Sequence, residues 1–401
     1  MNILVLNAGS SSIKFQLFDL KKNEVIAGGL VESIGESTGG ISYKCFENGS
    51  VSFELKEKKP IKNHNTGLKQ IADLLLDSEN GVIKDASQIE VVGHRVVHGA
   101  ELFSKPVLVN KEILKQLKEV SFLAPLHNPA NIEGIEIASE VFPKASQVAV
   151  FDTAFHQTIP EHAFRFPIPN ELYEKNRLRV YGFHGTSHAF VSKKAADYLN
   201  IPIDTFNAIT VHLGNGCSMA AIKNGKSVDV SMGLTPLSGL MMGTRSGDVD
   251  PSLPLFMSEN LGMKTSDIDR MLNKESGLKG IAGDNDLRKV LERVDAGDVQ
   301  AKLAVEMYVY RIKKYIGAYL AVLGSCHCVI FTAGVGENSA LIRKLTIENM
   351  ENLGIQLDED KNKTSAGVSV ISTDSSQTKV MVVPTNEELE IATQAYELIN
   401  S

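Results

Sequence analysis

The sequence contains no apolar run that approaches the length of a membrane-spanning helix. Such a helix needs about 18 or more consecutive apolar residues, so we expect no transmembrane segment. The opening residues, MNILVLNAGSSSIKF, also lack the basic start and long apolar stretch of a signal peptide. There are only four cysteines, without the spacing of a disulfide framework. These absences predict a protein of the reducing cytoplasm.

Two of the cysteines flank a histidine, in Cys326-His327-Cys328. This triplet invites a metal interpretation. Zinc sites usually show paired ligand spacings, however, and no second pair follows. The run 326–331 is typical of a buried strand, which favours structural cysteines over metal ligands.

The sequence also has no surplus of basic residues. The formal net charge is −7, whereas nucleic-acid or membrane-surface binding needs a basic face. We therefore expect no nucleic-acid partner and no membrane partner. The 43% apolar and 22% charged residues are ordinary for a folded protein, and 401 residues predict two domains. No low-complexity linker separates them.

One pattern of predicted elements occurs twice, roughly 200 residues apart. It consists of a strand, a turn rich in Gly, Asn and Ser, a second strand, another turn and a third strand. The two copies cover 3–6, 13–18 and 24–30, with a turn at Lys21-Lys22-Asn23, and 208–213, 219–222 and 227–230. The late strand 148–151, before Asp152, also resembles 328–331. We expect a duplicated domain in which these two late strands are equivalent.

Other segments show clear periodicity. Helices are expected at 65–78, 111–120, from 131, 299–323 and 387–399, and strands at 89–92 and 147–151. Pro125 and Pro129 predict a rigid turn between them.

The two Gly-rich turns, at 7–12 and 214–218, carry the first chemical signal. Such turns can present backbone N–H groups to phosphate oxygens, although either one alone could be an ordinary hairpin. Neither a GxxxxGK[ST] motif nor a GxGxxG motif is present there. Matching turns in both halves favour nucleotide binding. Lys14 adds a charge that could reach a phosphate or could simply be solvated.

A third Gly-rich segment, Gly334-Val335-Gly336-Glu337-Asn338, follows a predicted buried strand. It could leave helix N–H groups free for a phosphate, or be a plain strand-to-helix turn. The triplet Asp286-Leu287-Arg288 in the same half is a weaker candidate.

Two arginines, Arg95 and Arg245, lie in Gly-rich loops. Arginine binds carboxylates and phosphates through two parallel hydrogen bonds. A surface ion pair is the alternative for each, but two such arginines beside phosphate-type turns favour ligand binding.

His184 and His188 have a helical i, i+4 spacing. For His184 a phosphohistidine intermediate, a transition-state donor, a metal ligand and a core residue are all open, although the glutamate of a HExxH zinc motif is missing. Asp152 and Glu387 could hold or orient Mg²⁺, and Glu387 could instead stabilise a helix N-terminus.

Together these segments resemble the acetate kinase family. The resemblance covers essentially the whole chain and rests on the motifs NAGSSSIKF, GHRVVHG, LAPLHNP, VAVFDTAFH, YGFHGTSH, HLGNGCS, TPLSGLMMGTRSGDVDP, FTAGVGEN and PTNEE. It implies the α/β fold that the family shares with actin-like ATPases, a duplicated two-lobe, ribonuclease H-like fold with the active site between the lobes. It also implies a discontinuous first lobe, 1–152 plus 388–401, a nucleotide-binding second lobe, 153–387, and a homodimer.

The resemblance further implies roles for individual residues. Asn7 and Glu387 would bind Mg²⁺, which Mn²⁺ could replace, and Arg95 would bind the substrate carboxylate. Asp152, His184 and Arg245 would be catalytic, and Val97, Leu126 and Pro236 would line a pocket for the methyl group. The residues implied to surround ATP or ADP are Lys14, His212, Leu213, Gly214, Asn215, Gly216, Asp286, Leu287, Arg288, Gly334, Val335, Gly336, Glu337 and Asn338.

The implied reaction is reversible transfer of a phosphoryl group between ATP and acetate, giving acetyl phosphate and ADP. Acetate is already ionised at neutral pH, so a general-base role for Asp152 is suspect. We expect direct in-line transfer, with double displacement through His184 as the rival. Propionate or butyrate could replace acetate, because one methylene changes affinity by only about 1–3 kcal/mol. A non-catalytic, actin-like ATP-binding module is the alternative from another class.

Overall fold

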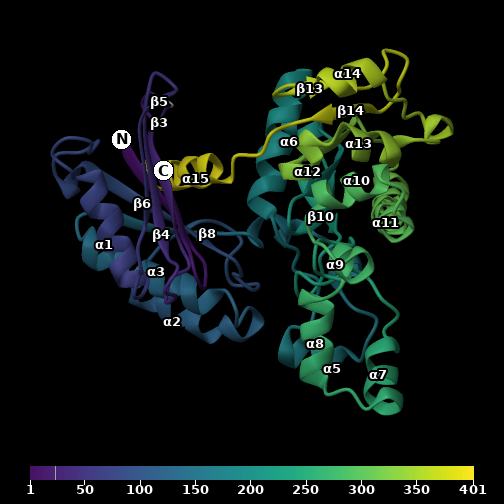
Figure 1. The fold of residues 1–401 in the computed structure, drawn as a ribbon, viewed down its shortest axis with the longest axis horizontal. Helices are drawn as coiled ribbons and strands as arrows, with labels where there is room; N and C mark the ends of the chain where they lie inside the picture. The colour runs from purple at the N-terminus through teal and green to yellow at the C-terminus, as the bar shows by residue number, and fades with distance from the viewer. Residues whose placement is uncertain (23) are drawn as a thin grey trace. The chain divides into compact units, whose positions relative to one another are not determined.

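The computed structural model describes residues 1–22 and 24–401. Asn23, the last residue of the expected turn after the second strand, lies outside this part of the chain. The chain forms two compact units, one made of Met1–Phe155 and Asn386–Ser401 and the other of His156–Thr385. Each unit contains one β-sheet with helices packed on it (Figure 1).

The sheet of the first unit has the strand order β5-β4-β3-β2-β1-β6-β8-β7. Strands β1 to β5 form an antiparallel meander, and β6 and β8 continue from β1 as parallel strands. The strands are β1 (Asn2–Ala8), β2 (Ile13–Asp19), β3 (Glu24–Glu32), β4 (Gly40–Glu47), β5 (Ser50–Lys58), β6 (Ile89–Val96), β7 (Val107–Leu108) and β8 (Ser146–Phe151). The helices are α1 (His64–Leu75), α2 (Lys111–Glu119), α3 (Asn128–Val141) and α15 (Glu387–Asn400), with short 3-10 turns at Ala86–Gln88 and Ser121–Leu123.

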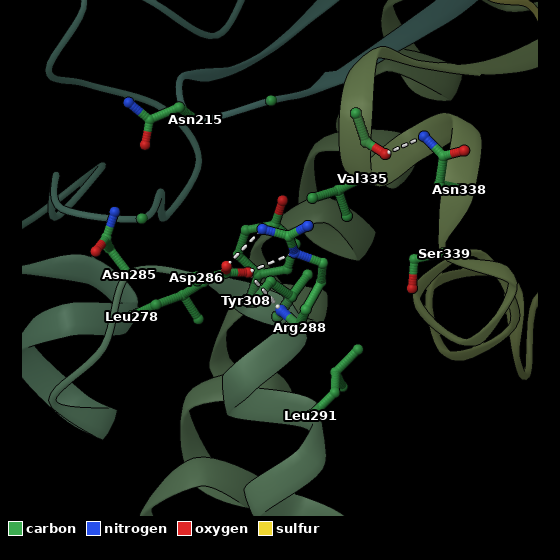
Figure 2. A pocket seen from close by; sticks show the side chains of 14 residues that line it. Asn215, Leu278, Asn285, Asp286, Arg288, Leu291, Tyr308, Val335, Asn338 and Ser339 are labelled. Atoms are coloured by element: carbon green, nitrogen blue, oxygen red, sulfur yellow. Dashed lines mark hydrogen bonds and ion pairs between the residues drawn. The ribbon is translucent and has the colours of Figure 1, made fainter. Parts of the chain in front are cut away.

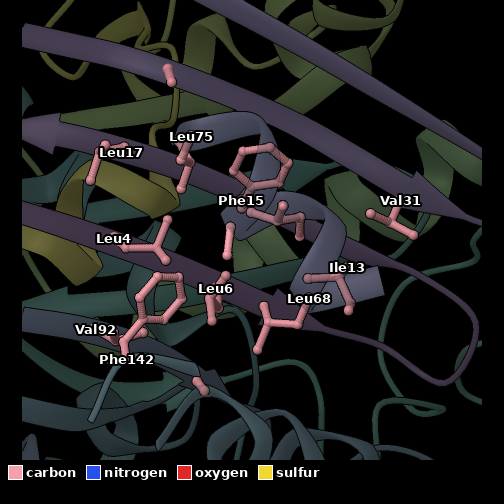
Figure 3. Close-up of a cluster of buried hydrophobic side chains, with 14 of the residues drawn as sticks. Leu4, Leu6, Ile13, Phe15, Leu17, Val31, Leu68, Leu75, Val92 and Phe142 are labelled. Carbon is pink, nitrogen blue, oxygen red and sulfur yellow. The ribbon is translucent and has the colours of Figure 1, made fainter. Parts of the chain in front are cut away.

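Strand β1 separates two apolar cores because successive side chains of a strand point to opposite faces. Leu4 and Leu6 pack with Leu68 of α1 (Figure 3). Ile3 and Val5 pack on the other face with Ile391 of α15. The C-terminal helix, yellow in Figure 1, therefore belongs to the sheet of the purple N-terminal strands.

Most element positions agree with the periodicity of the sequence. Two helix ends differ. Helix α1 stops at Leu75 rather than at 78, because the Leu75 carbonyl accepts hydrogen bonds from Val82 N and Ile83 N and the chain folds back. Helix α3 begins at Asn128 rather than at 131. Pro129 lies in its first turn, where a missing N–H costs nothing.

The sheet of the second unit has the order β11-β10-β9-β12-β14-β13. Its strands are β9 (Ala208–Leu213), β10 (Cys217–Lys223), β11 (Lys226–Val230), β12 (Cys328–Thr332), β13 (Ser369–Val370) and β14 (Lys379–Val382). The helices are α4 (Glu161–Phe164), α5 (Asn170–Asn176), α6 (Gly185–Leu199), α7 (Leu253–Leu261), α8 (Thr265–Lys274), α9 (Gly277–Ala282), α10 (Leu287–Asp295), α11 (Val299–Leu323), α12 (Ala333–Asn338), α13 (Ala340–Ile347) and α14 (Glu359–Thr364), with 3-10 turns at Ile203–Thr205 and Glu351–Leu353. The 3-10 turn Ala154–Thr158 spans the boundary between the two units.

The two sheets repeat the same core order, since β3-β2-β1-β6-β8 corresponds to β11-β10-β9-β12-β14. The internal duplication is therefore present, but the expected pairing of the late strands is wrong. Strand β12 takes the place of β6, next to the first strand of its sheet, whereas β8 corresponds to β14. In each half, the two parallel strands are short, buried and apolar. The local sequence therefore does not show which of them lies next to the first strand of the sheet.

The structure also bears on two expectations from the sequence, which concern membrane-spanning helices and disulfide bonds. Within residues 1–22 and 24–401, no helix is long and apolar enough to cross a bilayer. All four cysteines are free thiols, and Cys328 is buried in β12 while Cys326 lies just before it.

Asn131 of α3 joins two strand ends of the first unit. Its side chain is buried, accepts a hydrogen bond from Val97 N at 3.0 Å and donates one to Ala8 O at 2.7 Å. We predict that Asn131→Ala lowers the free energy of unfolding by about 2 kcal/mol or more, because each buried polar group left unpaired costs about 1–3 kcal/mol. Chemical denaturation measures this. Asn260→Ala, at an exposed position of α7, is the control, and equal losses in both variants would contradict the assignment.

Candidate active site

Arg95 and Asp152 form a bidentate ion pair at one edge of the first sheet. Arg95 lies near the end of β6, and Asp152 follows the last residue of β8. These parallel strands are neighbours, with Arg95 opposite Val150, so their carboxyl ends meet. Arg95 Nε donates to Asp152 Oδ1 at 3.1 Å, and Nη2 donates to Oδ2. Asp152 is almost fully buried.

Asn7, Glu387 and Lys14 lie around this pair. Arg95 Nη1 donates to Asn7 Oδ1 at 3.4 Å, and Glu387 Oε2 is 4.0 Å from Arg95 Nε. Lys14 lies opposite Asn7 in the β1–β2 pairing, and its Nζ is 2.5 Å from Glu388 Oε1. The structure thus gathers the charged and amide candidates of the first unit at one sheet edge.

The net charge at this edge is negative. Three carboxylates, those of Asp152, Glu387 and Glu388, face two cations, Arg95 and Lys14. Burial raises the pKa of Glu387 above its ordinary value; Arg95 opposes this shift, and the carboxylates of Asp152 and Glu388 add to it. Burial alone would lower the pKa of Arg95, but the charges of Asp152 and Glu387 outweigh it and the pKa is raised. Arg95 therefore stays a cation.

These oxygen groups fit a hard divalent cation. Mg²⁺ prefers oxygen ligands and needs only one or two carboxylates when phosphates supply the rest. Asn7 Oδ1 and the Glu387 carboxylate offer oxygen atoms of this kind, and an added cation would offset the surplus negative charge. In the part of the chain that the structure describes, no three His, Cys, Asp or Glu side chains form a metal site by themselves. The zinc alternative at His184 and His188 therefore gains no support.

The apolar candidates are divided between the units. Val97 is buried directly after β6, and Leu126 is 71% exposed in the turn before α3. Pro236 belongs to the second unit, where its carbonyl accepts a hydrogen bond from Arg245 Nη1 at 2.8 Å.

In the second unit His184 and Arg245 converge on Gly216. His184 precedes α6 and has a left-handed backbone, with φ of 57°. A Cβ on Gly216 would lie 3.4 Å from His184 Nε2 and 3.5 Å from Arg245 Nη1. The ring of His184 stacks on His212, with 4.3 Å between the ring centroids. Glycine at 216 thus lets both side chains approach the β9–β10 turn.

Arg245 differs from Arg95 in its partners. Burial lowers the pKa of Arg245 from its ordinary value, yet no carboxylate of the described residues forms an ion pair with it. Arg245 Nη1 instead donates a hydrogen bond to the neutral carbonyl of Pro236. A half-buried guanidinium without a counter-ion is suited to receive an anion.

A cavity of about 770 Å³ opens nearby in the same unit (Figure 2). Its size is in the range of pockets for small ligands. The expected nucleotide residues that line it are Gly214, Asn215, Asp286, Leu287, Arg288, Gly334, Val335 and Asn338. His212, Leu213, Gly216, Gly336 and Glu337 are in the same unit but do not line it, and Lys14 is in the other unit.

Local interactions fix the shape of this cavity. Asp286 caps α10 by accepting a hydrogen bond from Arg288 N at 3.0 Å, and it also pairs with the Arg288 guanidinium (Figure 2). These contacts, led by the Arg288 side chain, lower the pKa of Asp286 to about 2. Asn338 Nδ2 donates to Gly334 O at 2.8 Å and closes the turn of α12.

Several residues of the cavity carry no sequence signal. They come from separate elements and are common residue types: Leu278, Asn285, Leu291, Tyr308 and Ser339. Gly243 also lines the cavity and lies in the motif TPLSGLMMGTRSGDVDP, but it was not predicted as a site residue. Arg343 was also missed. It is buried behind α12, donates to Gly336 O at 2.9 Å and Glu337 O at 2.8 Å, and has its pKa lowered to about 10 by burial.

A family model described as the acetokinase family matches residues 2–393. The chain belongs to this family. It is 50% identical over 400 residues to the acetate kinase of Oleidesulfovibrio alaskensis, covering 100% of both chains. It is 52% identical over 399 residues to that of Helicobacter pylori, covering 99% of both. The resemblance seen in the sequence and the kinase assignment are thus confirmed.

Solved structures agree. The acetate kinase of Porphyromonas gingivalis matches with a TM-score of 0.94 at 43% identity, covering 99% of each chain. A propionate kinase from Francisella tularensis matches with a TM-score of 0.92 at 43% identity, also covering 99% of each chain. The two-domain actin-like ATPase fold is therefore confirmed. Membership in the acetokinase family implies ATP or ADP as substrate together with a divalent metal.

Glu387 provides a test of the charged edge of the first sheet. A carboxyl with a raised pKa contributes stability below its ordinary pKa and loses it as pH rises through the raised value. We predict that metal-free Glu387→Gln melts at a higher temperature than the wild type at neutral pH, with the difference vanishing below the ordinary pKa. Adding MgATP should raise the melting temperature of the wild type more than that of the variant.

Glu397→Gln, at an exposed position on the same helix, is the control. If Glu387 served only to stabilise the N-terminus of α15, its replacement would lower the melting temperature at neutral pH instead. Thermal unfolding from about pH 4 to 8 separates the two signs.

Proposed function

We propose that the protein catalyses reversible phosphoryl transfer between ATP and acetate, giving acetyl phosphate and ADP, with Mg²⁺ or Mn²⁺ as the metal. The observation that carries this proposal is the full-length identity of about 50% to acetate kinases. The cavity in the second unit and the arginine edge of the first unit support it, because the reaction needs one nucleotide site and one carboxylate site.

Residue roles follow from charge and position. Arg95, with Val97, Leu126 and Pro236, binds the acid. The nucleotide is bound by Lys14 and by the three segments 212–216, 286–288 and 334–338. Asn7 and Glu387 hold the metal, which neutralises phosphate charge when bound. Asp152, His184 and Arg245 are the catalytic group.

The central difficulty of the reaction is repulsion between two anions. Acetate needs no base because it is ionised at neutral pH. Phosphoryl transfer depends mainly on positioning and electrostatic stabilisation. Arg245, which forms no ion pair with a carboxylate of the described residues, and His184, which lies beside it at Gly216, stabilise the transferring phosphoryl group in this proposal. We propose direct in-line transfer, which predicts inversion at a chiral phosphorus; retention would favour double displacement through His184.

Propionate is a second candidate acceptor, since a propionate kinase is among the similar structures at 43% identity. An acyl-hydroxamate assay with ATP, Mg²⁺ and each of acetate, propionate and butyrate tests both. We expect the highest kcat/KM with acetate. A higher value with propionate would assign the second function, and no product with any acid would support a non-catalytic ATP-binding module.

Arg95 and Arg245 should give different kinetic signatures. We predict that Arg95→Ala mainly raises the KM for acetate, because a carboxylate contact is lost. Arg245→Ala should mainly lower kcat, by a factor on the order of 10²–10³, because a transition-state contact is lost. Steady-state kinetics with each substrate varied in turn measures the difference.

Arg270→Ala, at an exposed position of α8, should leave both constants unchanged. Near-normal kcat in purified, folded Arg245→Ala protein would show that its assigned role is wrong.

We also propose a cytoplasmic homodimer with no nucleic-acid or membrane partner, and functional lobes of 1–152 plus 388–401 and 153–387. The compact units have boundaries next to these. Helix α7 exposes Leu255, Phe256 and Leu261, and large exposed apolar side chains are typical of protein interfaces. Sedimentation velocity of the purified protein checks the dimer.

A further inference from the structure

A buried chain of polar side chains lies behind His184. His184 Nδ1 is 2.9 Å from Ser218 Oγ, and the same oxygen is 2.7 Å from His188 Nε2. His188 Nδ1 is in turn 2.7 Å from Thr210 Oγ1. Ser218, His188 and Thr210 have no solvent exposure. Buried networks of this kind are costly unless every member is paired.

Three elements bring the chain together. His184 and His188 are one helical turn apart at the start of α6, so both point toward the sheet. Ser218 lies on β10 and Thr210 on the neighbouring β9. The i, i+4 histidine spacing that suggested zinc therefore serves a shared serine hydroxyl.

The hydroxyl of Ser218 has a single proton and two histidine neighbours, so it donates to only one of them. The direction of these hydrogen bonds is set at Thr210, the last member of the series. Thr210 Oγ1 donates to Ala220 O at 3.3 Å, so it accepts from His188 Nδ1–H. His188 is neutral, because burial, with smaller contributions from His156 and His212, lowers its pKa well below the ordinary value. Its Nε2 is then an acceptor.

The remaining assignments follow in order. Ser218 donates to His188 Nε2 and accepts a hydrogen bond from His184 Nδ1–H. We propose that Ser218 and His188 are positioning residues that keep the proton of His184 on Nδ1 and fix the plane of its ring. This inference rests on the proposed role of His184 in phosphoryl transfer.

The proposal has a chemical consequence. With Nδ1 always protonated, a hydrogen bond from Nε2 to an anionic phosphoryl oxygen requires the imidazolium form of His184. Ser218 Oγ, as an acceptor at Nδ1, stabilises that form. The titratable and charged groups that face His184 are His188 on α6, His212 on β9 and Arg245. His188 is neutral, and the positive charge of Arg245 opposes the imidazolium form of His184.

Ser218→Ala tests the proposal. We expect kcat to fall about 10- to 100-fold with little change in the KM for ATP or acetate, because the ring is misplaced rather than removed. The wild-type rate should fall as pH rises through the titration of His184. In Ser218→Ala this limb should move to lower pH, because the acceptor that favours the cation is lost.

Ser227→Ala is the matched control. Ser227 is also a buried serine bonded to a histidine, with its Oγ 2.8 Å from His156 Nδ1, but it has no bond to His184. It should keep wild-type kcat and pH dependence. Equal losses in the two variants, or unchanged kinetics in Ser218→Ala, would overturn the proposal.

A second measurement reads the protonation of His184 directly rather than through activity. In wild-type protein with ¹⁵N-labelled histidine, NMR should show His184 Nδ1 protonated at every pH and Nε2 gaining its proton as pH falls. His184→Gln identifies the signals. A neutral ring protonated on Nε2 would overturn the proposal. If His184→Gln itself kept wild-type kcat, the proposed role of His184 would fail instead.

Discussion

The buried ion pair between Arg95 and Asp152 is the interaction on which the first unit depends for its chemistry. It exists because β6 and β8 are adjacent and parallel, so that both side chains emerge at the same sheet edge. Arg95 has its carboxylate neighbours at fixed positions and does not change its charge. A guanidinium held in this way is pre-oriented, and less conformational entropy is lost when it binds a second carboxylate. Burial, together with the surplus of negative charge at this edge, raises the pKa of Glu387. A divalent cation is suited to offset this negative charge.

The second unit uses the same strand order for a different purpose. Its parallel strand β12 leads into the turn of α12, where Gly334 and Val335 line the cavity and Arg343 holds the turn from behind. Among the described residues, no carboxylate forms an ion pair with Arg245, in contrast to Arg95. This difference is consistent with the role proposed for Arg245, because a permanent counter-ion would weaken a guanidinium that stabilises charge developing in a transition state. The duplicated halves thus share one strand order, while Arg95 and Arg245 differ in their partners.

The sequence allowed much of this to be predicted. Apolar patterns located β1 to β3 and β9 to β11, and the helical periodicity of α11 predicted its ends at Val299 and Leu323. Strands β4 and β5 were not predicted. The helix ends at Leu75 and Asn128 depend on backbone hydrogen bonds and proline placement that periodicity does not encode. The equivalence of the late strands was wrong because strand order is a tertiary property. Tyr308 and Leu278 went unnoticed for a similar reason, since a residue that lines a cavity has the same local pattern as one in the core. Arg343 could have been found only as one of two adjacent basic residues, with Lys344, in a mostly apolar helix.

The geometry also bears on how Asp152 acts. Both of its carboxylate oxygens accept hydrogen bonds from Arg95, so its negative charge is already committed to orienting that side chain. Acetate, being ionised, offers no proton for a base to remove. Asp152 is therefore best understood through what it holds in place. Removing it would release Arg95 and at the same time alter the charge felt at Glu387.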